Sequence, residues 1–103
     1  MQKACATDKQ GKRRWGADQW KILKRRIAVL EAAPTLADLK GMPGRTHPLT
    51  ADRKGEFAIG LWRGYRLVFA PNHDPVPNDA TGGIDQARVT RIVIREVVDY
   101  HGD

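Results

Sequence analysis

The C-terminal segment RIVIREVVDYHGD ends an apolar run with three side chains that can exchange protons. Asp99, Tyr100 and His101 follow directly on β-branched residues that favour a strand. A polar strand end that only faces water would have the same composition. Histidine and tyrosine are also suitable general acids and bases, so this end of the chain is equally a candidate reaction centre.

Cleavage of RNA without a metal needs few groups beyond those in the second half of the chain. A base removes the 2′-hydroxyl proton, an acid protonates the leaving 5′-oxygen, and cations stabilise the charge on the phosphate. His47 and His101 are candidate proton-transfer groups, and Arg66 can donate two hydrogen bonds to a phosphate. Each residue also has a structural interpretation: strand entry for His47, a salt bridge for Arg66 and core packing for Tyr100.

Other common chemistries lack their residues. The chain contains no serine, and its one cysteine, Cys5, has no activating neighbour in the sequence. The three histidines, His47, His73 and His101, do not have the spacing of metal ligands. No glycine-rich phosphate loop of the GxxxxGK type is present. We therefore expect no metal and no other cofactor.

The charge balance favours a polyanionic partner. Lysine and arginine total 18 against 12 acidic residues, which gives a net charge of +6, and basic groups attract phosphates and release counterions on contact. No apolar run is long enough to span a membrane, and the first residues have no signal-peptide core. The single cysteine fits a reducing cytoplasm, where we expect the protein. The charge alone leaves two alternatives open, a nucleic acid or the ribosome as partner, and a small basic protein that binds no nucleic acid.

The segment GADQWKILKRRIAVLEAAP predicts an amphipathic helix. Asp18 is expected as its N-cap, and Pro34 ends it. One face of this helix carries an apolar stripe at helical spacing and the other is basic: Trp20, Leu23, Ile27 and Leu30 against Lys21, Lys24 and Arg25.

Two shorter helical segments are predicted around it. Residues 2–14 are expected to form a helix broken near Gly11, and residues 35–45 a helical turn capped by Thr35 and followed by a Pro–Gly turn.

The second half of the chain predicts an antiparallel sheet. Residues 56–62 and 65–70 alternate between apolar and polar residues across a short connection, which is typical of a hairpin. Residues 71–86 are rich in proline, glycine and aspartate and are expected to form a surface loop before a last strand at 87–100. Helices followed by such a sheet indicate a single α+β domain over residues 1–103, with N-terminal helices packed on one face of a small twisted sheet.

Strict alternation divides the last strand between two faces. Ile92, Ile94 and Val98 are expected on one face. The other would hold Arg91, Arg95, Asp99 and His101, mixed with Val93 and Val97. The second face would then present basic groups to a phosphate backbone.

The order of these segments resembles the RelE/ParE superfamily of toxin–antitoxin toxins, and within it the HigB-like plasmid-maintenance killer proteins. The landmarks are an RxxxLExA helix end, DL..MPG, HPL..DRKGEF, YRLVF and a terminal DYH, in one consistent order over roughly residues 20–101. The loop PNHDPVPNDATGGID is also similar to that of a subgroup of these proteins.

The resemblance implies a function. It implies a compact sheet with a concave basic face, ribosome-dependent endoribonuclease cleavage of mRNA, and inhibition by a cognate, HigA-like antitoxin in a hetero-oligomer, with no membrane involved. The catalytic residues that it implies are His47, Arg66, Asp99, Tyr100 and His101. The acid and base roles of His47 and His101 stay open. Residues expected to bind RNA phosphates are Arg53, Lys54, Arg91 and Arg95.

The chain departs from the family pattern at two places. Thr50 and Ala51 stand where HigB-like toxins often have lysine and glycine, so either Arg53 or Lys54 replaces that cation or catalysis is weaker. The family usually begins with a strand before the first helix, and this chain is expected to start inside the helix. Either the sheet lacks its first strand, with an exposed edge that a partner could cover, or the natural start lies upstream.

Two other functions stay open with the same fold. One is inhibition of DNA gyrase, as in ParE-like members, which generally lack the histidine cluster. The other is a non-catalytic relative that keeps only a surface for antitoxin or RNA.

Overall fold

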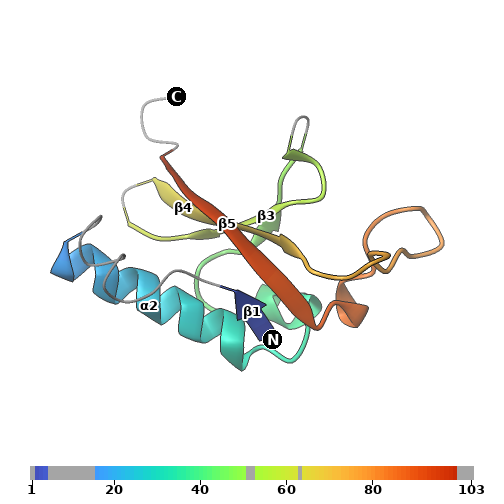
Figure 1. Ribbon diagram of the computed structural model, residues 1–103, viewed down its shortest axis with the longest axis horizontal. Coiled ribbons are helices and arrows are strands. Elements are labelled where there is room, and N and C mark those ends of the chain that lie inside the picture. The colour runs from blue at the N-terminus through green and yellow to red at the C-terminus, as the bar shows by residue number, and fades with distance from the viewer. Residues whose placement is uncertain (1, 5–15, 51–52, 63, 100–103) are drawn as a thin grey trace.

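The computed structural model describes residues 2–4, 16–50, 53–62 and 64–99 (Figure 1). Its elements in chain order are β1 (Gln2–Ala4), α2 (Ala17–Ala32), the 3₁₀ helix η1 (Leu36–Gly41), β2 (His47–Pro48), β3 (Phe57–Gly60), β4 (Tyr65–Pro71), the 3₁₀ helix η3 (Gln86–Arg88) and β5 (Arg91–Asp99).

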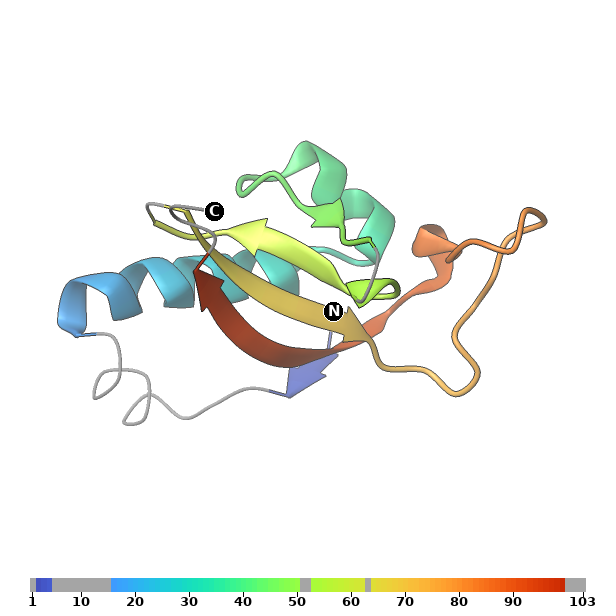
Figure 2. The ribbon, with the colours of Figure 1, turned by 90° about the horizontal axis from the view of Figure 1, so that it is seen from above.

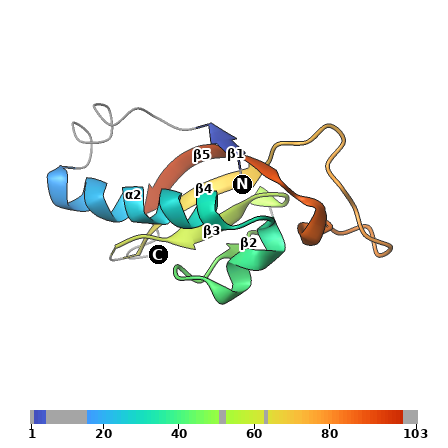
Figure 3. The same ribbon diagram turned by 90° about the horizontal axis from the view of Figure 1, so that it is seen from below.

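The five strands form one sheet in the order β1-β5-β4-β3-β2. Strands β2 to β5 pair antiparallel with their neighbours, and β1 pairs parallel with β5. Helix α2 lies across one face of the sheet (Figure 3), and the opposite face is turned to the viewer in Figure 2. The predicted α+β architecture, with helices on one sheet face, is therefore confirmed.

Strand β1 corrects two expectations about the N-terminus. Gln2 pairs with Arg91 and Ala4 with Val93, so the sheet does have a strand before its first long helix. The expectation of a sheet without that strand was wrong, as was a helix at residues 2–4; the rest of that predicted helix lies outside the described residues. Three residues carry no readable alternation, and their partner is at the other end of the chain, so tertiary pairing decides their conformation.

Helix α2 packs through the predicted apolar stripe. Trp20, Leu23 and Leu30 are buried, and Ile27 is partly buried against the same core. The helix begins after Gly16, whose φ of 82° only glycine adopts easily, and the predicted N-cap Asp18 instead lies in the first turn. A carboxylate there still interacts favourably with the helix dipole.

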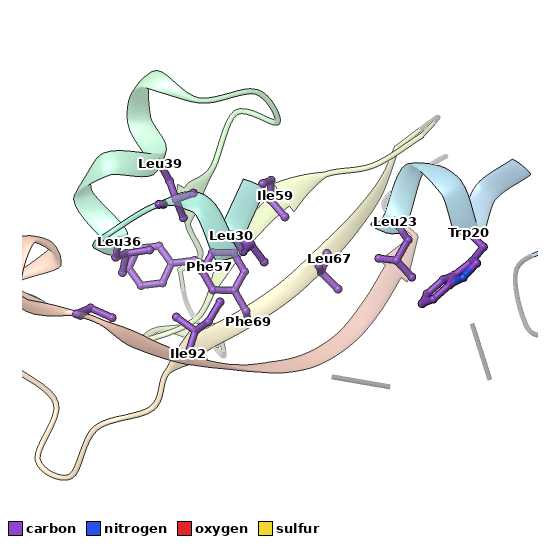
Figure 4. Close-up of a cluster of buried hydrophobic side chains, with 12 residues drawn as sticks. Trp20, Leu23, Leu30, Leu36, Leu39, Phe57, Ile59, Leu67, Phe69 and Ile92 are labelled. Carbon is purple, nitrogen blue, oxygen red and sulfur yellow. The ribbon is translucent and has the colours of Figure 1, made fainter. Parts of the chain in front are cut away.

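The core lies between α2, η1 and the sheet (Figure 4). Phe57 of β3 and Phe69 of β4 stack with ring centroids 6.0 Å apart, and Leu36 and Leu39 of η1 belong to the same buried cluster. The predicted hairpin is observed, because these phenylalanines are directly opposite each other in register. Each fully buried leucine or phenylalanine contributes roughly 2 kcal/mol.

A β-bulge in β5 changes which residues face the core. Phe69 pairs with Ile94 and the preceding Val68 with Glu96, so Arg95 has no partner in the register. An extra residue shifts the alternation of the strand by one position.

The shift exchanges the roles of two valines. Val97 pairs with Leu67 and packs on the core, whereas Val98 pairs with Arg66. The prediction that Val98 shares a face with Ile92 and Ile94 was therefore wrong. The sequence pattern around the bulge contains no glycine or proline that marks it.

The predicted loop between β4 and β5 projects from the body of the protein (Figures 1 and 2). The Asp79 carboxylate folds its tip: Oδ1 accepts hydrogen bonds from Thr81 N at 2.9 Å, Thr81 Oγ1 and Gly83 N at 3.1 Å. At the base, His73 Nε2 accepts from the backbone N–H groups of Thr90 and Arg91. The loop is therefore tied at both its tip and its start.

We predict that the loop tip loosens in acid. The hydrogen bonds from Thr81 and Gly83 lower the pKa of Asp79 below its ordinary value of 3.8. A carboxyl whose folded-state pKa is lowered stabilises the fold above its unfolded pKa, and this contribution is lost as the pH falls through the folded-state value. The amide proton shifts of Thr81 and Gly83, followed by NMR from pH 6 downwards, should titrate below pH 3.8. Asp79→Asn is the control, and the same titration in that variant would contradict the assignment.

Candidate phosphate-binding site

A pocket of about 370 Å³ opens where the end of β3 meets α2 and the turn before β2. Its volume lies in the range that holds a small ligand. Three of its residues are arginines and none carries a carboxylate: it is lined by Arg26, Gly44, Arg45, His47, Gly60, Leu61 and Arg66. Guanidinium groups suit phosphate in charge and in geometry, so the pocket is a candidate anion site.

Gly60, the last residue of β3, joins the three segments that form the pocket. Its N–H donates to the Gly44 carbonyl at 2.7 Å, and its carbonyl accepts from Arg26 Nε at 2.8 Å. The approach of the two glycines is close, since a Cβ on Gly60 would lie 3.1 Å from the Gly44 oxygen. Both α2 and the Pro–Gly turn are thus fixed to the end of the hairpin.

Two of the pocket arginines are oriented by backbone carbonyls. Arg26 Nε binds the Gly60 oxygen, and Arg66 Nη1 donates to the Tyr65 oxygen at 3.1 Å. A carbonyl fixes a guanidinium without neutralising its charge. Within the described part of the chain, no carboxylate pairs with Arg26, Arg45 or Arg66. Their remaining N–H groups are therefore suited to an anion.

His47 is held in one tautomer. Its Nδ1 lies 3.0 Å from the carbonyl oxygen of Arg45. Because a carbonyl only accepts hydrogen bonds, Nδ1 carries the proton in the neutral ring and Nε2 is the basic nitrogen. A neutral imidazole with a defined basic nitrogen is the form that a general base requires.

The sheet register places His47 and Arg66 on the same face. His47 pairs with Ala58, and Arg66 pairs with Gly60, two residues further along β3. Residues two apart in a strand project to the same side. The structure therefore brings together two of the residues that the resemblance implied, and both line the pocket.

The predicted C-terminal cluster is described only in part. Asp99 pairs with Tyr65, the neighbour of Arg66, so β5 ends beside the strand that supplies the pocket arginine. Tyr100 and His101 lie outside the described residues. Their predicted roles stay predictions.

Two of the predicted phosphate-binding arginines are paired with acids instead. Arg53 Nη1 lies 3.1 Å from Glu56 Oε1, and its other terminal nitrogen binds the Glu96 carboxylate. Arg95 Nε lies 3.9 Å from Glu56 Oε2. The two glutamates compensate much of this positive charge, so this part of the open sheet face is less attractive to phosphate than the pocket.

Lys54 and Arg91 lie outside the pocket. Lys54 is exposed in the turn before β3. Arg91 is exposed at the start of β5, seven residues before the Val98 that pairs with Arg66, which corresponds to about 23 Å along a strand. Of the four cations predicted to bind phosphate, none lines this pocket.

Sequence reasoning missed Arg26 and Arg45 as site residues. Arg26 was identified only as the arginine of the RxxxLExA pattern at the helix end. It lies one helical turn before the buried Leu30, so its position next to the apolar stripe could have indicated that it faces the sheet. Arg45 follows the Pro–Gly turn two residues before His47, a spacing that indicates proximity but not direction. The hydrogen bond from Gly60 to Gly44, which brings them together, has no local sequence signal.

The described residues include neither a membrane-spanning helix nor a metal-binding cluster. They contain no helix that is both long and apolar enough to cross a bilayer. Nor do three or more of their His, Cys, Asp and Glu side chains gather in a way that could hold a metal ion.

Comparison with known proteins supports the fold. No protein-family profile matches the chain, and no curated protein matches it significantly in sequence. Among solved structures, the chain is similar to a YoeB/ParE toxin from Agrobacterium tumefaciens, with a TM-score of 0.58 and 16% identity over 98% of this chain and 100% of that one. The RelE/ParE-like fold expected from the sequence is therefore confirmed. The HigB-like subgroup stays a prediction.

We predict that Gly44→Ala severely destabilises the protein and with it the pocket. Gly44 has a φ of 111°, and an added Cβ would lie 2.4 Å from Ile59 Cγ1 in the core. Backbone strain and the clash together should cost about 3 kcal/mol, measured by urea unfolding. Gly55→Ala is a matched control, because Gly55 has a φ of 95° but open space around it, and should cost about 1 kcal/mol. Equal losses in the two variants would contradict the packing argument.

Proposed function

We propose that the chain is the toxin of a type II toxin–antitoxin system and cleaves ribosome-bound mRNA without a metal. The observation that carries the proposal is the pocket in which His47, with a defined basic nitrogen, lies together with Arg66 among cations that no described carboxylate neutralises. A base beside a phosphate-binding arginine is the minimum that 2′-hydroxyl attack on a phosphodiester requires.

Each residue has a role in this proposal. Arg66 binds a non-bridging oxygen of the scissile phosphate and stabilises the charge that develops there. His47 Nε2 accepts the 2′-hydroxyl proton, since its Nδ1 proton is already engaged with the Arg45 carbonyl. His101 then protonates the leaving 5′-oxygen, and Asp99 and Tyr100 are proposed as further catalytic residues. These last three roles rest on the resemblance of the terminal DYH to the family's catalytic cluster.

The finer family assignment is part of the proposal. The order HPL, YRLVF and DYH supports the HigB-like plasmid-maintenance group and a HigA-like antitoxin as partner. The similar structure is itself a toxin by its name, which supports the same general class. A substrate on the ribosome would place the protein in the cytoplasm.

One observation favours a second candidate, a relative with weak or no catalysis. Thr50 and Ala51 replace the family's lysine and glycine, and Arg53 does not simply supply the missing charge, because it is ion-paired with Glu56 and Glu96. Such a protein would keep its binding surface and lose turnover. Cleavage kinetics distinguish this candidate from an active endoribonuclease.

We predict that purified protein cuts a reporter mRNA only when ribosomes are translating it. Arg66→Ala should lower the cleavage rate about 30-fold or more through loss of a charge-assisted hydrogen bond, and His47→Ala or His101→Ala at least about tenfold. Arg53→Ala should stay within about threefold, because that charge is already compensated. Primer extension maps the cuts and circular dichroism checks the fold of each variant.

Three further experiments make this assay decisive. In a parallel reaction, a toxin known to cleave ribosome-bound mRNA must cut the same message. If that toxin cuts the message and this protein leaves it intact, the endoribonuclease activity is rejected. A DNA supercoiling assay with gyrase then tests the ParE-like activity. Growth arrest on expression of the wild type, and equally of an Arg66→Ala, His101→Ala double variant, would point to toxicity by binding alone.

A further inference from the structure

Arg45 has an unusual backbone conformation. Among the described residues it is the non-glycine residue with a positive φ, at 53°. Left-handed geometry is unfavourable for a residue with a Cβ, and glycine or asparagine would adopt it more easily. A long cationic side chain at such a position needs a reason, and conformations of this kind concentrate at functional sites.

The surroundings of Arg45 supply two reasons. Its carbonyl accepts the Nδ1 proton of His47, so the left-handed turn directs this oxygen to the histidine. Its exposed side chain lines the pocket with Arg26 and Arg66. Glycine would satisfy the first requirement equally well, because the first involves only the backbone. The second requirement alone explains an arginine.

We propose that the pocket is a preformed subsite for the phosphate of a single nucleotide, with Arg26 and Arg45 as phosphate ligands beside Arg66. This inference rests on the proposed function, because it places the nucleotide next to the scissile bond in the same pocket. It adds two ligands that the sequence did not indicate. It also adds that the free protein binds a nucleotide without the ribosome.

The geometry of Arg26 supports a preformed site. Its Nε is engaged with the Gly60 oxygen, which leaves the two terminal nitrogens for an anion. The same Gly60 holds the Arg45 turn through Gly44, so two guanidinium groups are attached to one strand end before any ligand arrives. Preorganised donors lose less entropy when they bind.

The size and lining of the pocket support a nucleotide as the ligand. About 370 Å³ is more than an isolated phosphate needs, and Leu61 offers an apolar side chain beside the three arginines. Phosphate at the arginines would leave the sugar or base near Leu61. Adenosine 3′-monophosphate has this arrangement and is a suitable probe.

The test is titration calorimetry of the free protein with adenosine 3′-monophosphate at low ionic strength, without ribosomes. Arg45→Gly keeps the left-handed turn and removes only the side chain, and Arg45→Lys keeps the charge. Arg88→Ala is the matched control, because Arg88 is an exposed arginine of η3 outside the pocket. Arg26→Lys tests the second ligand. A single ammonium group cannot reproduce the guanidinium, whose Nε binds the Gly60 carbonyl while its two terminal nitrogens bind phosphate.

We expect Arg45→Gly to weaken binding about tenfold or more while its Tm is equal to or above that of the wild type. Arg45→Lys should lose less, Arg26→Lys several-fold, and Arg88→Ala less than about twofold. A stable variant with weaker binding separates ligand contact from a structural role.

Three results would overturn the subsite. These are unchanged binding in Arg45→Gly, equal binding of adenosine without phosphate, or no binding to the wild type at about 10 mM nucleotide. The titration contains no ribosome, so it tests the subsite separately from cleavage. If the nucleotide binds in the titration but the mRNA stays intact in the cleavage assay, the proposed function is rejected and the subsite is retained. Cleavage without nucleotide binding would reject the subsite alone.

Discussion

The geometry of the pocket depends on the two backbone hydrogen bonds of Gly60. Its N–H binds the Gly44 carbonyl and its carbonyl binds Arg26, so the end of one strand fixes a turn and a helix that are far apart in the sequence. Without these bonds, β3 would end in two unsatisfied polar groups, which is costly wherever water is excluded. The bonds also favour glycine, because a Cβ on Gly60 would lie 3.1 Å from the Gly44 oxygen, which is closer than most Cβ contacts. One local constraint therefore satisfies the backbone and assembles the site.

Four arginines among the described residues differ in how their charge is compensated. Arg26 and Arg66 are oriented by carbonyl oxygens and keep their full charge for a ligand. Arg53 and Arg95 are paired with Glu56 and Glu96 on the open face of the sheet, and there each carboxylate offsets an attraction for phosphate. The net charge of +6 alone therefore does not locate a phosphate site, because Arg53 and Arg95 are compensated by carboxylates whereas the described arginines of the pocket are not. Of these two places, the pocket at the end of β3 is therefore the better site for a phosphate.

Much of the fold could be predicted because the local periodicity of the sequence determines it. The apolar stripe of α2 and the alternation of the hairpin need only helical or strand periodicity to be read, and both are observed. The residues His47 and Arg66 could be named from the resemblance, and the register of β2 to β4 brings them to one face. Strand β1 could not be predicted, because three residues without alternation acquire their conformation only from pairing with β5. Arg26 and Arg45 were missed for the same reason: their proximity arises from long-range backbone bonds.

The bulge at Arg95 shows how one unpaired residue determines the open face. Before it, Ile92 and Ile94 contact the core; after it Val97 does, and Val98 moves opposite Arg66. Had the strand alternated strictly, Val97 would have left the core and a different residue would have stood beside Arg66. The bulge also sets Arg95 and Glu96 side by side near Arg53 and Glu56, where the ion pairs form. The irregularity that the sequence did not reveal therefore determines the register in which the last strand reaches the candidate site.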